Sequence, residues 1–477
     1  MITVQIAGAG AGKTHGLASQ IAAKLAEAET DKKIHALTYT NTARDKIKSA
    51  LKMHTDGARV NVDTVHSFLL NEIIFPYAYY ILGEKYKSIS LEQLPENPRY
   101  KNNRITTLKR RGIIHIENVY ILAKQILDKT NAKNKSKTSK GKVDFVHGLL
   151  KNLISSIFID EVQDLDEDCL RVFHVLGSIG IYVYMIGDPK QAIKHPNSLN
   201  NYIEEFKKED SNVVFENINN VTRRVPNSSL RISNYFCYAD QQQTNITDFE
   251  GSVHYIYNDT MNFENAIQQC ILNDKLVIIN QKNNFYCTNL ERDNIIPYEL
   301  ATILEDGPKR NNRDPKIYIN SIVIDLVERI KQFPDTPNNQ AANHIIKIHD
   351  LSALLRGFKN GFALFYAFSE SLANKGTTTN YLVKSIEAVK GLDSDIVFFI
   401  LSNSFTQYLC DENIDKKNRF NKEWKKLYVA LTRSKDKLVF VLDKRLINAE
   451  NLEKYETFFN SKNINMINDG SECLNWL

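Results

Sequence analysis

The octet Ala7-Gly8-Ala9-Gly10-Ala11-Gly12-Lys13-Thr14 follows directly on a short apolar run, Ile2–Ile6, and decides the fold class. Glycines in such a loop let backbone N–H groups cradle phosphates, the lysine reaches the β- and γ-phosphates, and the threonine hydroxyl ligates Mg²⁺. The helix expected over residues 15–28 points the positive end of its dipole at the bound anion. Ala7 stands where the strict pattern has its first glycine. We predict that all eight residues bind a nucleotide, with ATP and Mg²⁺ as the ligands.

Composition and charge permit a nucleic-acid partner without requiring one. The 477 residues are 43% hydrophobic and 25% charged, as in ordinary globular proteins, and the net charge is only +5. The six cysteines show no metal-ligand spacing, so we expect reduced thiols in a cytoplasmic protein. No apolar run approaches the roughly 18 residues of a membrane-spanning helix, and we expect no membrane partner.

Positive charge is concentrated in one segment of the chain. Between Lys85 and Lys142 there are 15 Lys and Arg residues against 4 acidic ones, a local net charge of +11. Such an excess is a candidate electrostatic footprint for nucleic-acid phosphates. A solvated face or a mobile loop would have the same composition, and the sequence leaves both interpretations open.

Strand-like apolar runs alternate with helical patterns in the first third of the chain. The runs are residues 2–6, 34–39, 60–62, 157–160 and 181–186. This alternation predicts an α/β fold with a doubly wound parallel sheet, whose phosphate site lies at the carboxyl ends of the strands. We predict a first sheet domain from residues 1–70 and 149–212. Residues 71–148 break the rhythm and are predicted to form a basic helical insertion.

The alternation resumes near residue 213. Further strand-like runs are residues 253–257, 276–279, 382–386, 396–401 and 438–442. We predict a second sheet domain from residues 213–288 and 376–477. The mostly helical block at residues 289–375 would be a second, reduced insertion.

The segment Phe158-Ile159-Asp160-Glu161 is an apolar strand that ends in two adjacent carboxylates. ATP hydrolysis needs one carboxylate to hold Mg²⁺ and another to orient and deprotonate the attacking water. We assign the first role to Asp160, with Thr14 as the other metal ligand, and the second role to Glu161.

The chain resembles the UvrD/Rep-like branch of superfamily 1 DNA helicases in a series of ordered segments. These are AGAGAGKT at 7–14, LTYTN at 37–41, TVHSF at 64–68, IDEVQD at 159–164, GDPKQ at 187–191, TRRVP at 222–226, SIEAVKGLD at 385–393 and LYVALTRSK at 427–435. Together they span both predicted sheet domains.

The resemblance implies two RecA-like P-loop domains, each with a mainly helical insertion, that hydrolyse ATP between them. It implies catalytic roles for Lys13, Glu161, Gln191, Arg223 and Arg433, nucleotide contacts for Gly391 and Asp393, and nucleic-acid contacts for Tyr39, Thr64 and His66. The two arginines would come from the far side of the nucleotide, as arginine fingers that stabilise charge at the γ-phosphate. Hydrolysis would then be coupled to domain closure, which makes an ATPase a motor.

The sequence departs from the family pattern at four places. Only six residues precede Ala7, where relatives carry an adenine-reading glutamine, and Thr222 stands where relatives carry a base-stacking tyrosine. We therefore expect weak base specificity. Residues 192–197, AIKHPN, lack the aromatic side chains that stack on single-stranded bases in relatives, and Glu387 replaces a histidine.

Among compact relatives, the chain is similar to the helicase-like subunit of the Gabija anti-phage system. Two functions therefore compete. The first is an ATP-dependent DNA translocase or helicase of 3′-to-5′ polarity, acting on single-stranded DNA or a tailed duplex. The second is a DNA- or nucleotide-sensing ATPase subunit that regulates a partner nuclease without processive unwinding. The missing aromatic residues favour the second, whereas Arg433 and the Lys390-Gly391-Leu392 segment favour the first.

Overall fold

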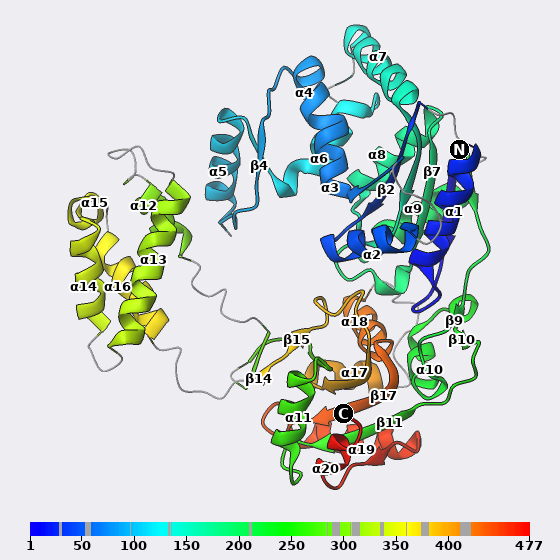
Figure 1. Cartoon of the computed structure of the whole chain (residues 1–477), viewed down its shortest axis with the longest axis vertical. Coiled ribbons are helices and arrows are strands. Elements are labelled where there is room, and N and C mark those ends of the chain that lie inside the picture. The colour runs from blue at the N-terminus through cyan, green and yellow to red at the C-terminus, as the bar shows by residue number, and fades with distance from the viewer. Residues whose placement is uncertain are drawn as a thin grey trace. The chain divides into compact units, whose positions relative to one another are not determined.

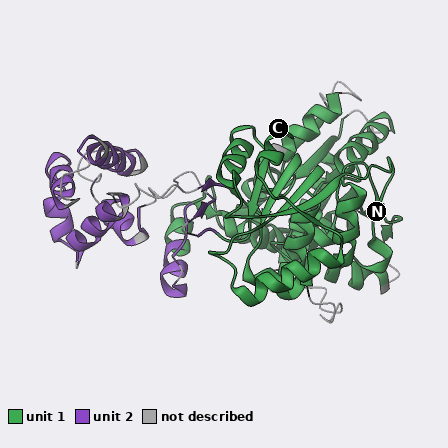
Figure 2. Cartoon of the chain, turned by 90° about the horizontal axis from the view of Figure 1, so that it is seen from below, with its two compact units in different colours: residues 1–91, 105–281, 383–477 green, residues 92–104, 282–382 purple. Residues whose placement is uncertain are grey.

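A computed structural model describes residues 1–27, 31–52, 59–95, 97–131, 134, 136–208, 212–283, 285–288, 296–305, 307, 315–333, 338–358, 360–373, 381–410 and 421–477. Its contacts divide the chain into two compact units (Figure 2). Unit 1 comprises residues 1–91, 105–281 and 383–477, and unit 2 comprises residues 92–104 and 282–382. Unit 1 contains two six-stranded sheets, which are drawn in Figure 1.

The first sheet is parallel throughout and carries the phosphate loop beyond one of its inner strands. Its strand order is β3 (Val60–Thr64), β2 (Lys33–Thr38), β6 (Ile154–Ile159), β7 (Tyr182–Gly187), β1 (Ile2–Ile6) and β8 (Val213–Phe215). The helices that connect these strands are α1 (Lys13–Glu27), α2 (Asn41–Lys52), α8 (Glu167–Ser178) and α9 (Ser198–Lys208). The inner strands are almost wholly buried, as expected of a parallel sheet covered on both faces.

The second sheet is also parallel. Its order is β15 (Lys384–Ser385), β12 (Leu276–Ile279), β16 (Ser394–Ile400), β17 (Ser434–Leu442), β11 (Ser252–Tyr257) and β18 (Asn465–Met466). Its helices are α10 (Asn227–Ser233), α11 (Phe263–Leu272), α17 (Asn403–Cys410), α18 (Lys422–Leu431), α19 (Ala449–Ser461) and α20 (Ser471–Leu474). The predicted α/β fold class, with two RecA-like domains, is confirmed. We call residues 1–91 and 105–220 the first sheet domain, and residues 221–281 and 383–477 the second.

One predicted strand, residues 382–386, is divided in the structure. Leu382 ends β14 (Tyr381–Leu382), which pairs with β13 (Tyr286–Cys287), whereas β15 pairs with β12 of the large sheet. The apolar pattern of this run could not reveal the division, because both pieces are extended.

The predicted insertion at residues 71–148 is largely helical. Its elements, with the helical lead-in from residue 65, are α3 (Val65–Phe68), a π-helix (Leu69–Ile74), α4 (Phe75–Leu82), β4 (Ser88–Ser90), α5 (Pro98–Arg110), β5 (Ile113–His115), α6 (Val119–Leu127) and α7 (Lys137–Leu153). Ile73, Val119 and Val146 belong to the same buried cluster as Ile2 and Val4 of strand β1. Most of this insertion therefore shares the core of the first sheet domain.

Unit 2 is a helical bundle joined by residues 92–104. Its helices are α12 (Tyr298–Glu305), α13 (Pro315–Gln332), α14 (Asn338–Ile348), α15 (Ser352–Arg356) and α16 (Gly361–Ala373), packed around their own apolar cluster. Arg104 pairs with Glu92 and, at 3.0 Å, with Glu305 of α12. Contacts thus group part of the first predicted insertion with the second, and the predicted boundaries stay a prediction.

No helix in the described ranges is both long and apolar enough to cross a bilayer.

Candidate active site

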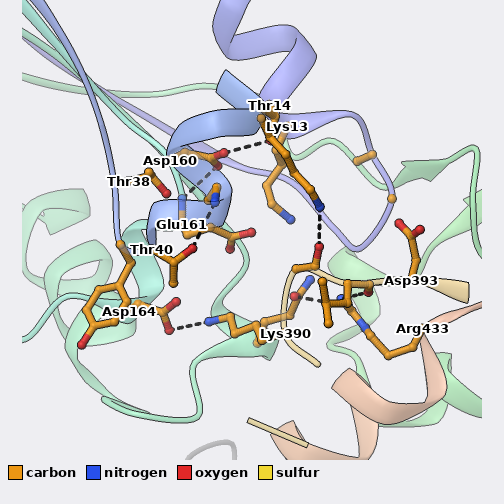
Figure 3. A pocket seen from close by; sticks show the side chains of 18 of the residues that line it. Lys13, Thr14, Thr38, Thr40, Asp160, Glu161, Asp164, Lys390, Asp393 and Arg433 are labelled. Carbon is orange, nitrogen blue, oxygen red and sulfur yellow. Dashed lines mark hydrogen bonds and ion pairs between the residues drawn. The ribbon is translucent and has the colours of Figure 1, made fainter. Parts of the chain in front are cut away.

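A cavity of about 610 Å³ lies in unit 1, with walls from both sheet domains (Figure 3). The first sheet domain contributes loops that follow β1, β2, β6 and β7, because the carboxyl ends of parallel strands meet at one edge of a sheet. The second contributes the segments around Arg224, Lys390 and Arg433. Of the predicted site residues, those lining the cavity are Gly10, Ala11, Gly12, Lys13, Thr14, Tyr39, Asp160, Glu161, Gln191, Gly391, Asp393 and Arg433.

The second half of the phosphate loop is open to a ligand. Gly12 has φ +77°, and an added Cβ there would meet nothing within 4 Å. No group in the described ranges accepts a hydrogen bond from the backbone N–H of Gly12, Lys13 or Thr14. Unpaired N–H groups at the start of α1 attract an anion, since they carry the positive end of the helix dipole. This half of the loop therefore suits a phosphate group.

The first half of the loop is already hydrogen-bonded to protein. The N–H of Ala7 donates to the Gly187 carbonyl at 3.0 Å, and that of Gly8 donates to the Asn219 carbonyl at 3.0 Å. Ala7, which replaces the usual glycine, is buried within the core beneath the sheet. A methyl group is accommodated there because Ala7 continues the strand as a β-bridge to Asn219 and does not turn around a ligand.

The lysine of the loop points back along the phosphate loop itself. Its Nζ lies 3.4 Å from the Ala7 carbonyl oxygen and 3.3 Å from that of Gly8. From this position the ammonium group can reach a phosphate bound to the open half of the loop. Figure 3 shows Lys13 beside Thr14 and Asp160.

Asp160 and Thr14 form a pair of oxygen ligands suited to Mg²⁺. The Thr14 hydroxyl donates to Asp160 Oδ2 at 3.0 Å, and Asp160 is 2% exposed. Burial and the neighbouring charge of Glu161 raise the pKa of Asp160 to about 6, although Lys13 opposes the shift. A buried carboxylate beside a hydroxyl is the oxygen donor set that this hard cation prefers. Within the described ranges, no group of three or more His, Cys, Asp or Glu side chains could hold a metal ion.

Glu161 is held in a backbone conformation that is unusual for a glutamate. Its φ is +56°, in the left-handed region, and Gln163 Nε2 donates to its carboxylate. Burial alone would raise the pKa of Glu161, but the charges of Lys13 and Lys390 outweigh burial and lower it. The carboxylate is therefore ionised, as a general base must be. Strained backbone of this kind recurs at functional sites.

Arg433 brings a buried positive charge into the cavity from the second sheet domain. The residue is 1% exposed, and its Nε donates to the Val429 carbonyl at 2.9 Å. One terminal nitrogen lies 3.4 Å from Gln191 Oε1, and Gln191 in turn donates to Asp188 at 2.9 Å. Burial lowers the pKa of Arg433 to about 9, which leaves the guanidinium protonated at neutral pH. Among the residues that the structure describes, no carboxylate forms an ion pair with Arg433, and its charge can serve a phosphate.

The structure places Arg224, and not Arg223, in the cavity wall. The side chain of Arg223 is exposed, and its backbone N–H bonds the Gly10 carbonyl at 3.2 Å. Arg224 lines the cavity, pairs with Asp393 at 3.3 Å and donates to the Thr432 carbonyl at 3.1 Å. Arg224 is therefore a second candidate for the role predicted for Arg223. Alignment to the family segment selects Arg223, because Thr222 takes the tyrosine position, but it does not show which of the two side chains faces the cavity.

Two further charged residues of the family segments, Lys390 and Asp164, have no predicted role. Lys390 pairs with Asp164, and both line the cavity (Figure 3). This ion pair joins the strand-end carboxylates of one sheet domain to the KGL segment of the other. The signal was present in the sequence, because both residues lie inside the family segments.

The predicted nucleic-acid residues have protein partners. His66 stacks on Tyr120, with ring centroids 4.7 Å apart, and meets Tyr39 edge-on at 5.9 Å. Burial and the charge of Lys194 lower the pKa of His66 to about 4, so the ring is neutral. The Thr64 hydroxyl caps helix α3 by accepting from the Ser67 N–H at 3.2 Å.

Lys194, in the segment that lacks aromatic residues, lies over the Tyr39 ring at 4.1 Å. A cation at this place binds phosphates more readily than it stacks on bases. In this segment the chain thus presents a positive charge where the expected aromatic ring is absent.

Residues 1–196 match a family model described as an AAA domain. The chain is 26% identical over 484 residues to Gabija protein GajB from Bacillus cereus (strain VD045), and the alignment covers 92% of each chain. Among solved structures it is similar to one described as a complex of Arterivirus nonstructural protein 10 (helicase) with DNA, at 10% identity and a TM-score of 0.33. That alignment covers 92% of this chain and 59% of the other. The family model and the Gabija relative bear out the predicted resemblance to UvrD/Rep-like helicases and to a protein of the Gabija system.

Proposed function

We propose that the protein is an ATP-dependent translocase or helicase of the UvrD type, which moves 3′ to 5′ on DNA in the cytoplasm. The observation that carries the proposal is the composition of the cavity. Open phosphate-loop amides and adjacent carboxylates come from the first sheet domain, while Arg224, Lys390 and Arg433 come from the second. ATP bound there would contact both domains at once.

Each residue of the site has a separate role in the proposed hydrolysis. The amides of Gly12–Thr14 and the Lys13 ammonium bind the β- and γ-phosphates. Thr14 and Asp160 would hold Mg²⁺, which neutralises charge on the phosphate oxygens when bound. Glu161 orients the attacking water and takes its proton. Gln191 accepts from Arg433 at 3.4 Å and so links the first sheet domain to that guanidinium.

Arg433 and Arg224 stabilise the negative charge that develops on the transferred phosphoryl group. Both belong to the second sheet domain, so hydrolysis requires that domain to be docked against the first. Repeated docking and release on a bound strand is how such an ATPase would move.

A second candidate is a DNA- or nucleotide-sensing ATPase subunit that regulates a partner nuclease. Lys194 occupies the segment in which relatives have base-stacking aromatic residues, which favours phosphate contact over grip on individual bases. The similarity to a Gabija protein also supports a partner subunit.

The two candidates are separated by ATPase and strand-displacement assays on the purified chain. We expect single-stranded DNA to stimulate hydrolysis under either one. A motor unwinds a duplex with a 3′ single-stranded tail and leaves a 5′-tailed duplex intact. Stimulation without displacement of either substrate would favour the sensing subunit, and the assay is then repeated with the partner present. A chain that hydrolyses no ATP, with or without DNA, would contradict both.

A further inference from the structure

Two side chains of the second sheet domain form hydrogen bonds with the backbone of Ala9 in the phosphate loop. The Ala9 N–H donates to the Tyr428 hydroxyl at 3.2 Å, and the Ala9 carbonyl accepts from Gln243 Nε2 at 2.9 Å. Tyr428 lies on α18, and Gln243 directly precedes β10 (Thr244–Asn245). Both backbone groups of one loop residue are therefore satisfied by the opposite domain.

The two side chains also bond each other, which closes a ring of hydrogen bonds. The Tyr428 hydroxyl donates to Gln243 Oε1 at 2.6 Å. Burial raises the pKa of Tyr428 well above its usual range, so the hydroxyl keeps the proton that it donates. The ring thus runs from the Ala9 N–H through Tyr428 and Gln243 back to the Ala9 carbonyl. Asp188, 3.2 Å from the same hydroxyl, offers an alternative acceptor from the first sheet domain.

Apolar packing also holds Ala9 against the second sheet domain. Ala9 is 0% exposed and belongs to the apolar cluster that contains Val225 and Leu427 of the second sheet domain. A Cβ on Gly8 would lie 2.4 Å from Gln243 Nε2, and one on Gly10 would lie 2.4 Å from Thr222 Oγ1. The absence of a side chain at these two glycines therefore leaves room for residues of the second sheet domain as well as for a phosphate.

Gln243 and Tyr428 are themselves held in place by contacts within the second sheet domain. Asn234 accepts from the Gln243 N–H at 2.8 Å and donates to the Gln243 carbonyl at 2.9 Å. Tyr428 is 1% exposed on the helix that ends just before Arg433. Because both are rigidly held, they move with their domain.

We propose that Tyr428 and Gln243 are positioning residues that set the shape of the phosphate loop, so that the affinity for nucleotide depends on docking of the second sheet domain. The inference rests on the proposed ATP site. It assigns to the second domain a part in binding the nucleotide, separate from the part of Arg433 in the chemical step. When the domains separate, Ala9 loses both of its hydrogen-bond partners, and the affinity of the open amides for phosphate falls with them.

The test compares Tyr428→Phe and Gln243→Glu with the wild-type chain. The first removes the hydroxyl from the ring, and the second removes the amide donor to the Ala9 carbonyl while keeping the side-chain size. Each leaves a buried backbone group without a partner, and we expect the Kd for ADP and the KM for ATP to rise about tenfold. The turnover number at saturating ATP should stay within about threefold, since Glu161 and Arg433 are untouched.

Tyr455→Phe is the matched control. Tyr455 is also buried in the second sheet domain, and its hydroxyl donates to the Ser402 carbonyl at 2.8 Å, away from the cavity. If Tyr428 and Gln243 only stabilised the fold, their variants would behave like this control, with a lower Tm and unchanged KM. That outcome would overturn the inference. A wild-type chain that binds neither ADP nor ATP would instead contradict the proposed function, so the two failures are distinguishable.

Discussion

The two sheet domains contribute to the cavity in different ways. The first presents backbone amides, a lysine and carboxylates, all on loops that directly follow strands β1 and β6. The second presents Arg224, Lys390 and Arg433 from three separate segments. Under the proposed function, the first side binds phosphate and activates water, and the second supplies positive charge. We therefore expect most of the nucleotide contacts to come from the first domain and hydrolysis to require both.

The largest effect should come from removing the lysine of the phosphate-binding side. We expect Lys13→Ala to reduce ATP hydrolysis to the uncatalysed rate and to weaken nucleotide binding, because the Lys13 ammonium lies along the loop, 3.4 Å from the Ala7 carbonyl and 3.3 Å from the Gly8 carbonyl. Hydrolysis assays and ADP titrations measure both. Lys24→Ala, on the same helix but paired with Glu27 at the surface, is the control and should behave as wild type. Undiminished turnover by Lys13→Ala would refute the phosphate site.

A smaller effect, confined to the chemical step, should follow from Glu161→Gln. The amide cannot take a proton, so the turnover number should fall by about 10²–10⁴-fold. Nucleotide binding should persist, since the amides of the loop remain. Single-turnover hydrolysis together with a binding titration separates these quantities, with Glu205→Gln on α9 as a surface control. Loss of binding in Glu161→Gln would point to a structural role for this carboxylate.

The smallest effects should come from the two adjacent arginines of the second sheet domain. Arg224→Ala should lower the turnover number by about 10²-fold, because it removes a donor that faces the developing charge. Arg223→Ala should change turnover little, since its side chain is exposed. Steady-state kinetics on the pair would settle the assignment. The reverse order of effects would restore Arg223 as the finger.

Much of the first sheet domain could be predicted from the sequence. Strand β1 matches its predicted run at both ends, and the phosphate loop and the Asp160–Glu161 pair lie where the pattern placed them. The reason is that strand, loop and helix follow one another within about 30 residues, so local patterns carry the information. Such contiguous motifs need no tertiary knowledge.

The second side could be predicted only in part. Arg433 lines the cavity as expected, but the choice between Arg223 and Arg224 depends on the direction in which each side chain leaves the backbone. The grouping of residues 92–104 with unit 2 is accompanied by the ion pair of Arg104 with Glu305, which lies 201 residues further along the chain. Long-range pairing of this kind leaves no periodic signal in either segment.

The glycines of the octet at residues 7–14 show which features follow from the sequence and which depend on the tertiary structure. The sequence by itself determined that a phosphate loop exists, because only small residues with free amides and a following Lys-Thr pair fit that chemistry. The tertiary structure alone decided what each glycine does. Gly12 faces open space for a ligand, whereas Gly8 and Gly10 make room for Gln243 and Thr222. The sequence limits which backbone conformations a residue can adopt. Which of these conformations is needed depends on the neighbours in space, and here these neighbours lie more than 200 residues away along the chain.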